Sequence, residues 1–286
     1  MTETPPTGRL RTLDVDGVRL AVREWGEPTG RPLLFWHPLG TVTSGAWLTE
    51  LAPVLVRAGW HLVAPDGPGF GVSEPVPAEE MGVDRPVQAQ LVGHSWGGVV
   101  ATCAAASRPD DVEALVLLDS GHLDYADYPE SQPGQSLDDR AADVAGQLEV
   151  WADRAALHAD VAGDVRRPVT DLLLAALAPA VRTRDDGALV PVVSARTVAG
   201  ARHGMVHERS SARWPVLAEA GVPVLLLLAD EPAEVRDRGA AAAARMATVV
   251  PQLEARVMTG WGHDLVGDGG PALAEVVVGW LDDVRP

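Results

Sequence analysis

Short apolar runs separated by helical patterns dominate the first part of the chain. The runs Pro32 to Trp36, His61 to Ala64 and Ala114 to Leu118 are apolar nearly throughout, as expected for strands buried on both faces of a sheet. Helical spacing is found in Ala46 to Ala58 and in Gly97 to Ser107. This alternation predicts an α/β fold with a mostly parallel sheet that is covered by helices on both faces.

The alternation stops in the middle of the chain, where helical patterns follow one another without a convincing strand. These patterns cover Leu137 to His158, Pro168 to Val181 and, less clearly, Ala195 to Arg209. A strand pattern returns at Val222 to Leu228, and the helical stretch Pro271 to Val284 follows near the end. We therefore predict an α/β core in two parts, residues 1–121 and 215–286, interrupted by an α-helical cap over residues 122–214.

Two further segments of the predicted core have a distinct pattern. Arg11 to Gly26 alternates as a β-hairpin does, with its turn at Asp16-Gly17. The connection Gly67 to Ala89 contains three prolines, and only Ala78 to Val83 could form a helix there. Since a crossover between parallel strands normally carries a longer helix, we expect this one to be short or irregular.

A serine motif follows the apolar strand Gln90 to Val92. Residues Gly93 to Gly98 read Gly-His-Ser-Trp-Gly-Gly, and a G-x-S-x-G sequence between a strand and a helix is typical of a nucleophile elbow. The tight turn strains the backbone of Ser95, and the small residues around it leave room for that turn. The hydroxyl then stands at the positive end of the next helix. We predict Ser95 as a nucleophile rather than as part of an ordinary glycine-rich turn.

A base must take the proton of this hydroxyl before it can attack. His263 ends the sequence Gly-Trp-Gly-His, between the last predicted strand and the C-terminal helix. The glycines allow the loop to bring the imidazole over Ser95, so we predict His263 as the general base.

Backbone N–H groups are expected to stabilise the negative charge that develops on the substrate. One comes from the residue after the nucleophile, Trp96, and the other from the loop after Trp36, which reads His-Pro-Leu-Gly. Because Pro38 has no N–H group, we predict Leu39 and Trp96 as the donors of the oxyanion hole.

These motifs and their order resemble the α/β-hydrolase family over nearly the whole chain. The resemblance rests on the elbow at Ser95, the loop at His37, the Asp-Gly-Pro-Gly-Phe-Gly turn that begins at Asp66, the helical cap and the late Gly262-His263. It implies the α/β-hydrolase fold with a cap and a Ser–His–acid triad.

The resemblance leaves two positions for the acid that orients His263. Most family members carry an Asp about nine positions beyond the proline that opens the strand after the cap. Counted from Pro223, that position is Pro232, and Glu231 fits only with a slip of one residue. Some dehalogenases and lactone hydrolases of this fold place the acid after an earlier strand, which here gives Asp119. We predict Asp119, with Glu231 as the alternative.

Such a triad fits acyl transfer, in which Ser95 attacks the carbonyl of an ester or lactone and water releases the acyl group. Family members that act on halides or epoxides normally use aspartate as the nucleophile, so serine disfavours those reactions. The alternatives are an acyltransferase, a hydrolase or lyase of carbon–carbon bonds on the same triad, and a non-catalytic protein that binds a small molecule. We keep all of them open here.

Tryptophans near the predicted motifs suggest an apolar or aromatic small molecule as substrate. We predict Trp36, His37, Trp151 and Trp261 as substrate-binding residues, although tryptophans fill protein cores equally well.

Composition narrows the partners and the compartment. A net charge of −17, spread along 286 residues, argues against nucleic acid or an anionic membrane as partner. Cys103 is the single cysteine, so no intrachain disulfide can form. We see no signal peptide, no run long enough to span a membrane and no metal or nucleotide motif. We therefore expect a cytoplasmic enzyme without a metal or other cofactor.

Overall fold

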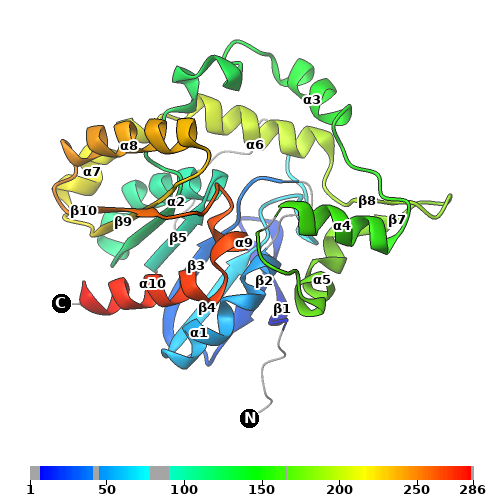
Figure 1. The fold of residues 1–286 in the computed structure, drawn as a ribbon, viewed down its shortest axis with the longest axis horizontal. Helices are drawn as coiled ribbons and strands as arrows, with labels where there is room; N and C mark the ends of the chain where they lie inside the picture. The colour runs from blue at the N-terminus through cyan, green and yellow to red at the C-terminus, as the bar shows by residue number, and fades with distance from the viewer. Residues whose placement is uncertain (1–6, 41–44, 78–89, 165, 285–286) are drawn as a thin grey trace.

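An eight-stranded sheet forms the centre of the computed structural model, which describes residues 7–40, 45–77, 90–164 and 166–284 (Figure 1). The strand order is β1-β2-β4-β3-β5-β6-β9-β10. The strands are β1 (Arg9–Val15), β2 (Val18–Trp25), β3 (Arg31–Trp36), β4 (Trp60–Pro65), β5 (Gln90–His94), β6 (Leu115–Leu118), β9 (Val224–Ala229) and β10 (Leu253–Met258). β2 is antiparallel to both of its neighbours, and all the other pairs are parallel. The prediction of a mostly parallel sheet is confirmed.

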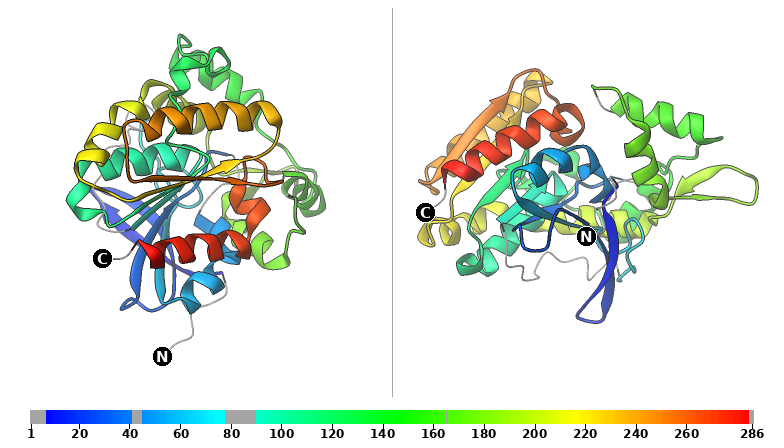
Figure 2. Two further views of the ribbon diagram at one scale, coloured as in Figure 1. Left: turned by 60° about the vertical axis from the view of Figure 1, so that its left-hand side comes forward. Right: turned by 90° about the horizontal axis from the view of Figure 1, so that it is seen from below.

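Helices cover both faces of the sheet, which is seen nearly edge-on in the left view of Figure 2. One layer holds α2 (Trp96–Ser107), α7 (Trp214–Glu219) and α8 (Ala233–Ala247), and the other holds α1 (Ala52–Arg57), α9 (Leu265–Gly269) and α10 (Pro271–Asp283). Every residue of β6 and β9 is buried between these layers. This is why both strands are apolar throughout, and burial of each large aliphatic side chain contributes about 1.5–3 kcal/mol.

Residues 122–214, which the sequence predicts as a cap and which are called the cap below, lie mainly along the top and right of Figure 1. The helices of the cap are α3 (Leu137–Ala145), α4 (Arg154–Asp164), α5 (Asp171–Leu177) and α6 (Ala195–His207). Its strands β7 (Val181–Thr183) and β8 (Leu189–Pro191) form an antiparallel hairpin. The expectation of a cap without strands was therefore wrong. The hairpin turns at Gly187, whose φ of 87° suits glycine, and each strand is too short to give a clear pattern.

Two predicted helices are also divided. The stretch Leu137 to His158 breaks after Ala145, because the backbone of Trp151 pairs with that of Leu189 before α4 begins. The stretch Ala46 to Ala58 is a 3-10 turn followed by α1, which has a proline in its first turn, where the missing N–H costs nothing. The predicted helix Ala78 to Val83 lies outside the described residues. None of the helices in the described part of the chain is long and apolar enough to cross a membrane.

Candidate active site

Ser95 lies in the sharp turn between β5 and α2. Its backbone has φ 54° and ψ −121°, a conformation that costs a non-glycine residue about 1–3 kcal/mol. Glycine is required on both sides of the turn. A Cβ atom at Gly93 would stand 2.2 Å from the carbonyl oxygen of Gly97, and one at Gly97 would stand 2.2 Å from that of Trp36. The surrounding contacts therefore hold Ser95 in its strained geometry.

The structure brings Ser95, His263 and Asp119 together. The Ser95 hydroxyl donates to Nε2 of His263 at 2.9 Å, and Nδ1–H of His263 donates to Oδ2 of Asp119 at 2.7 Å. Asp119 follows β6 directly, and its Oδ1 accepts the N–H of Ala229 at the end of β9 at 3.1 Å. The Asp119 side chain is almost fully buried, whereas that of His263 is half exposed.

The charges of this pair are mutually stabilised. Burial lowers the pKa of His263, but the hydrogen bond and the negative charge of Asp119 outweigh this, so the net pKa is above the ordinary value. Burial raises the pKa of Asp119, but the hydrogen bond and positive charge of His263, together with the N–H of Ala229, outweigh burial, so this pKa is below the ordinary value. An imidazolium at His263 is therefore stabilised, as a general base requires once it has taken a proton.

Glu231 lies apart from this hydrogen-bond chain. Its side chain is half exposed and accepts a hydrogen bond of 2.5 Å from the Arg166 guanidinium, which belongs to the cap. Of the two carboxylates predicted for the triad, only that of Asp119 bonds to His263.

Two residues that the sequence did not single out hold the loop that carries His263. The buried carboxylate of Asp268 accepts the N–H of Gly262 at 2.7 Å and the N–H of Arg166 at 3.0 Å. The Arg166 guanidinium also donates to the carbonyl oxygen of Gly260 at 2.8 Å. The cap thus bonds directly to the histidine loop. No local sequence pattern marks the contacts of Arg166, because they join residues 94 and 102 positions apart.

His94 supports the same loop from below. Its Nε2–H donates to the carbonyl oxygen of His263 at 2.7 Å, and its side chain is almost fully buried. Burial lowers the pKa of His94, so the ring is neutral at neutral pH. His94, the residue that precedes the nucleophile, therefore anchors the backbone of His263 through this hydrogen bond.

The loop after β3 lies against the start of α2. A Cβ atom at Gly97 would meet the carbonyl oxygens of both Trp36 and His37 within 2.7 Å, so the two backbones are in direct contact. Leu39 is half-buried and packs on the aromatic cluster that contains Trp96. The predicted N–H donors Leu39 and Trp96 therefore belong to adjoining segments, and their role in an oxyanion hole stays a prediction.

His37 is fully buried, with both ring nitrogens in use. Nδ1–H donates to the carbonyl oxygen of Pro38 at 2.7 Å, and Nε2 accepts the N–H of Gly67 at 2.9 Å. Burial lowers the pKa of His37 to about 4. Its ring packs edge-on against Phe70 and Trp96. These bonds give His37 a structural task, and neither nitrogen is left for the substrate contact predicted from sequence.

The predicted substrate-binding tryptophans have different surroundings. Trp36 packs edge-on against Trp96, with 6.1 Å between ring centroids. Trp261 is half-buried and lies against α9. Trp151 is buried in the cap, where its indole N–H donates to Asp160 at 2.9 Å. Trp36 and Trp261 thus flank the loops around Ser95, whereas Trp151 belongs to the framework of the cap. Contact with a substrate stays a prediction for all three.

In the described part of the chain, we find no group of three or more His, Cys, Asp or Glu side chains that could hold a metal ion. Burial raises the pKa of Cys103 to about 12, so its thiol is not a nucleophile at neutral pH.

Comparison with known proteins shows the family to which this chain belongs. Residues 31–166 match the family model described as alpha/beta hydrolase fold. The 2-hydroxymuconate semialdehyde hydrolase of a Pseudomonas species is 30% identical over 193 residues, which are 61% of this chain and 67% of the relative. This chain belongs to the α/β-hydrolase family. The fold expected from the resemblance is confirmed, and the family implies a small-molecule substrate.

Two further comparisons of this α/β hydrolase give a shorter match and a likeness of fold. Epoxide hydrolase A of Mycobacterium tuberculosis is 33% identical over 148 residues, 46% of this chain and 44% of the relative. The matches to the first four relatives span only 33–44% of their lengths. A solved structure of E-2-(acetamidomethylene)succinate hydrolase is 24% identical, with a TM-score of 0.73 and coverage of 96% of this chain and 99% of that chain. This likeness shows the fold only.

Proposed function

We propose that this protein is a serine hydrolase that cleaves a carboxylic ester or lactone of an apolar small molecule. The chain of two hydrogen bonds from Asp119 through His263 to Ser95 carries the proposal. Ser95 Oγ would attack the carbonyl carbon while its proton moves to Nε2 of His263. His263 would then give this proton to the leaving oxygen, and an acyl group would remain on Ser95.

Water completes the cycle in this proposal. His263 would take a proton from water, the hydroxide oxygen would attack the acyl carbon, and the carboxylic acid would leave as Ser95 recovers its proton. The N–H groups of Leu39 and Trp96 would stabilise the oxyanion in both steps, and each such donor contributes on the order of 3 kcal/mol. The serine at the nucleophile position favours this chemistry over the epoxide hydrolysis named for one of the relatives.

An activity-based label tests the proposal first. We expect a fluorophosphonate probe to add once to the intact protein, and peptide mapping to place the adduct on Ser95. The Ser95→Ala variant is the matched control and should not react. Absence of an adduct in the folded protein would contradict an activated serine and favour a protein that binds without turnover.

Substrate tests then separate the remaining activities. We expect p-nitrophenyl esters and simple lactones to be hydrolysed, and added alcohols to leave the yield of free acid unchanged. Formation of a new ester with the alcohol would instead indicate an acyltransferase. Faster hydrolysis of 2-hydroxymuconate semialdehyde than of any ester would move the proposal to the chemistry named for the Pseudomonas relative.

A further inference from the structure

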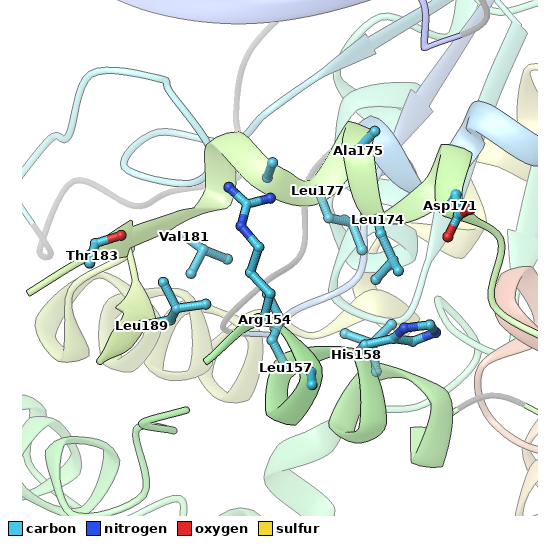
Figure 3. Close-up of a pocket in the computed structure, with 13 residues that line it drawn as sticks. Arg154, Leu157, His158, Asp171, Leu174, Ala175, Leu177, Val181, Thr183 and Leu189 are labelled. Carbon is cyan, nitrogen blue, oxygen red and sulfur yellow. The ribbon is translucent and has the colours of Figure 1, made fainter. Parts of the chain in front are cut away.

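A cavity lies within the cap (Figure 3). It is lined by residues of α4, α5 and the β7–β8 hairpin, is partly open to solvent and has a volume of about 420 Å³. Cavities of roughly 300–1,000 Å³ are typical of sites for small molecules. Ser95, His263 and Asp119 are not among its lining residues, so the cavity is distinct from the candidate active site.

Aliphatic side chains form the middle of this cavity. Leu157 and Val161 lie one helical turn apart on α4, and Leu174 and Leu177 do so on α5, so each helix turns an apolar face inward. Leu189 adds a further side chain from β8. Only Val161 and Leu177 are fully buried, and the other three are partly accessible. A ligand with an apolar body would therefore remove apolar surface from water.

One arginine side chain, that of Arg154, extends along the cavity. In Figure 3 the Arg154 side chain leaves α4 and its guanidinium lies near α5. Within the described residues, no ion pair of Arg154 is found. Two other arginines of the cap are paired, Arg166 with Glu231 and Arg184 with Asp186. The guanidinium of Arg154 is therefore available to an anion.

The opposite end of the cavity has different chemistry. Asp171 and His158 lie there, separated from the Arg154 guanidinium by Leu174 and Leu177 (Figure 3). The carboxylate of Asp171 repels a second negative charge at that end. The cavity is thus arranged for a molecule with one anionic end and an apolar body.

We propose that this cavity binds a small amphipathic monocarboxylate, an aliphatic chain that ends in one carboxylate. The carboxylate forms a bidentate ion pair with Arg154, a geometry for which the guanidinium is suited. The chain lies against Leu157, Leu174 and Leu189. Binding requires no step at Ser95, so this site is independent of the proposed hydrolysis.

Titration calorimetry with decanoate tests the site on the full chain. We expect one molecule of decanoate to bind, and Arg154→Gln to weaken this binding at least tenfold. Ala175→Phe, which enlarges a side chain that lines the cavity on α5, should abolish it. Arg182→Gln is the matched control, because Arg182 is exposed on β7 but does not line the cavity. Circular dichroism verifies that each variant is folded.

Two analogues test the charge pattern. In the wild type, 1-decanol should bind at least tenfold more weakly than decanoate, and the two should bind equally to Arg154→Gln. Decanedioate should bind more weakly than decanoate because its second carboxylate approaches Asp171. Equal binding of decanoate to the wild type, Arg154→Gln and Ala175→Phe would place it elsewhere, the Ser95 site included, and would overturn the proposal. Absence of decanoate binding would also overturn it, whatever the esterase assays give.

Discussion

The two oxygen atoms of Asp119 have different partners, and this makes the residue sensitive to a minimal change. Oδ2 accepts Nδ1–H of His263, while Oδ1 accepts the N–H of Ala229. In Asp119→Asn, an amide group that cannot carry negative charge replaces the carboxylate, and the imidazolium loses its stabilisation. We expect kcat for ester hydrolysis to fall by about three to four orders of magnitude, as measured by steady-state kinetics.

Glu231→Gln is the matched control for this substitution. Its ion pair with Arg166 is half exposed, and such pairs contribute roughly 0–1 kcal/mol. We expect kcat to change less than about threefold. Loss of activity in Glu231→Gln together with a nearly active Asp119→Asn would show that the acid has been assigned to the wrong strand.

The pH dependence of the reaction follows from the pKa of His263. Asp119 holds this pKa above its ordinary value, and only the neutral imidazole can take the proton of Ser95. We therefore expect kcat/KM to fall as the pH decreases through a midpoint above about 6.5. In Asp119→Asn, the residual activity should show this midpoint at a lower pH. A midpoint that does not move would mean that a different group limits the rate.

At the scale of elements, a buried carboxylate is one of the groups that hold the loop between β10 and α9. Asp268 accepts the N–H of Gly262, next to His263, and it also bonds to Arg166 of the cap. Asp268→Ala leaves the Gly262 N–H without its partner, which costs about 1–3 kcal/mol and frees the loop. We expect kcat to fall about tenfold in Asp268→Ala, since small displacements of a catalytic group are costly.

Asp268→Asn distinguishes positioning from a general loss of stability. The asparagine oxygen can still accept the Gly262 N–H, so we expect most of kcat to return while the bonds to Arg166 weaken. KM should change little in either variant. If both variants unfold at lower denaturant concentration but keep the wild-type kcat, the loop does not need Asp268 for its catalytic geometry.

Some elements are easier to predict from the sequence than others. Those defined by their own residues are clear, whereas those that depend on contacts with residues distant in the sequence are not. β6 and β9 are buried on both faces, so their apolar runs are clear in the sequence. The β7–β8 hairpin has three residues in each strand, and only the Asp186-Gly187 dipeptide marks its turn. The break before α4 depends on Trp151 pairing with Leu189, which no local pattern records.

The same distinction applies to the candidate site. Ser95 and His263 lie in short motifs, so each can be proposed from a few neighbouring residues. The choice between Asp119 and Glu231 depends on which carboxylate reaches His263 across the fold, and Asp119 does so from 144 positions away. Arg166 has no motif, and its contacts exist only because the cap folds back onto the histidine loop.

For the whole molecule, buried histidines connect stability to pH. His37, His94 and His122 are almost fully buried, and burial lowers the pKa of each. Below pH 6.5 the unfolded chain binds protons at these positions while the folded protein does not. The contribution of these neutral histidines to the free energy of unfolding is therefore fully present above the pKa of the unfolded chain. It is lost as the pH falls toward the lower pKa of the folded protein. For His37, with a pKa of about 4 when folded, the loss between pH 6.5 and 4 is about 3 kcal/mol.

The titration of Asp66 changes the free energy of unfolding in the opposite direction to that of the buried histidines. Burial raises its pKa to about 6, so between about pH 6 and 4 the folded protein binds a proton before the unfolded chain does. Acidification through this window therefore adds stability at Asp66, about 3 kcal/mol, against the losses at the histidines. Because three histidines oppose one aspartate, we expect the free energy of unfolding to decrease from pH 6.5 to 4, as measured by urea unfolding at a series of pH values.

Asp66→Asn removes the opposing contribution and gives this prediction its sharpest test. Asparagine carries no charge at any pH, so the variant is free of the cost of burying an ionised carboxylate that the wild type carries above pH 6. Its stability should fall more steeply than that of the wild type between pH 6 and 4, with an additional loss of about 3 kcal/mol. His158→Gln, a change at an exposed histidine, serves as the control. Parallel pH profiles for the wild type and Asp66→Asn would mean that Asp66 is ionised in the folded protein, held charged by Arg23 despite its burial.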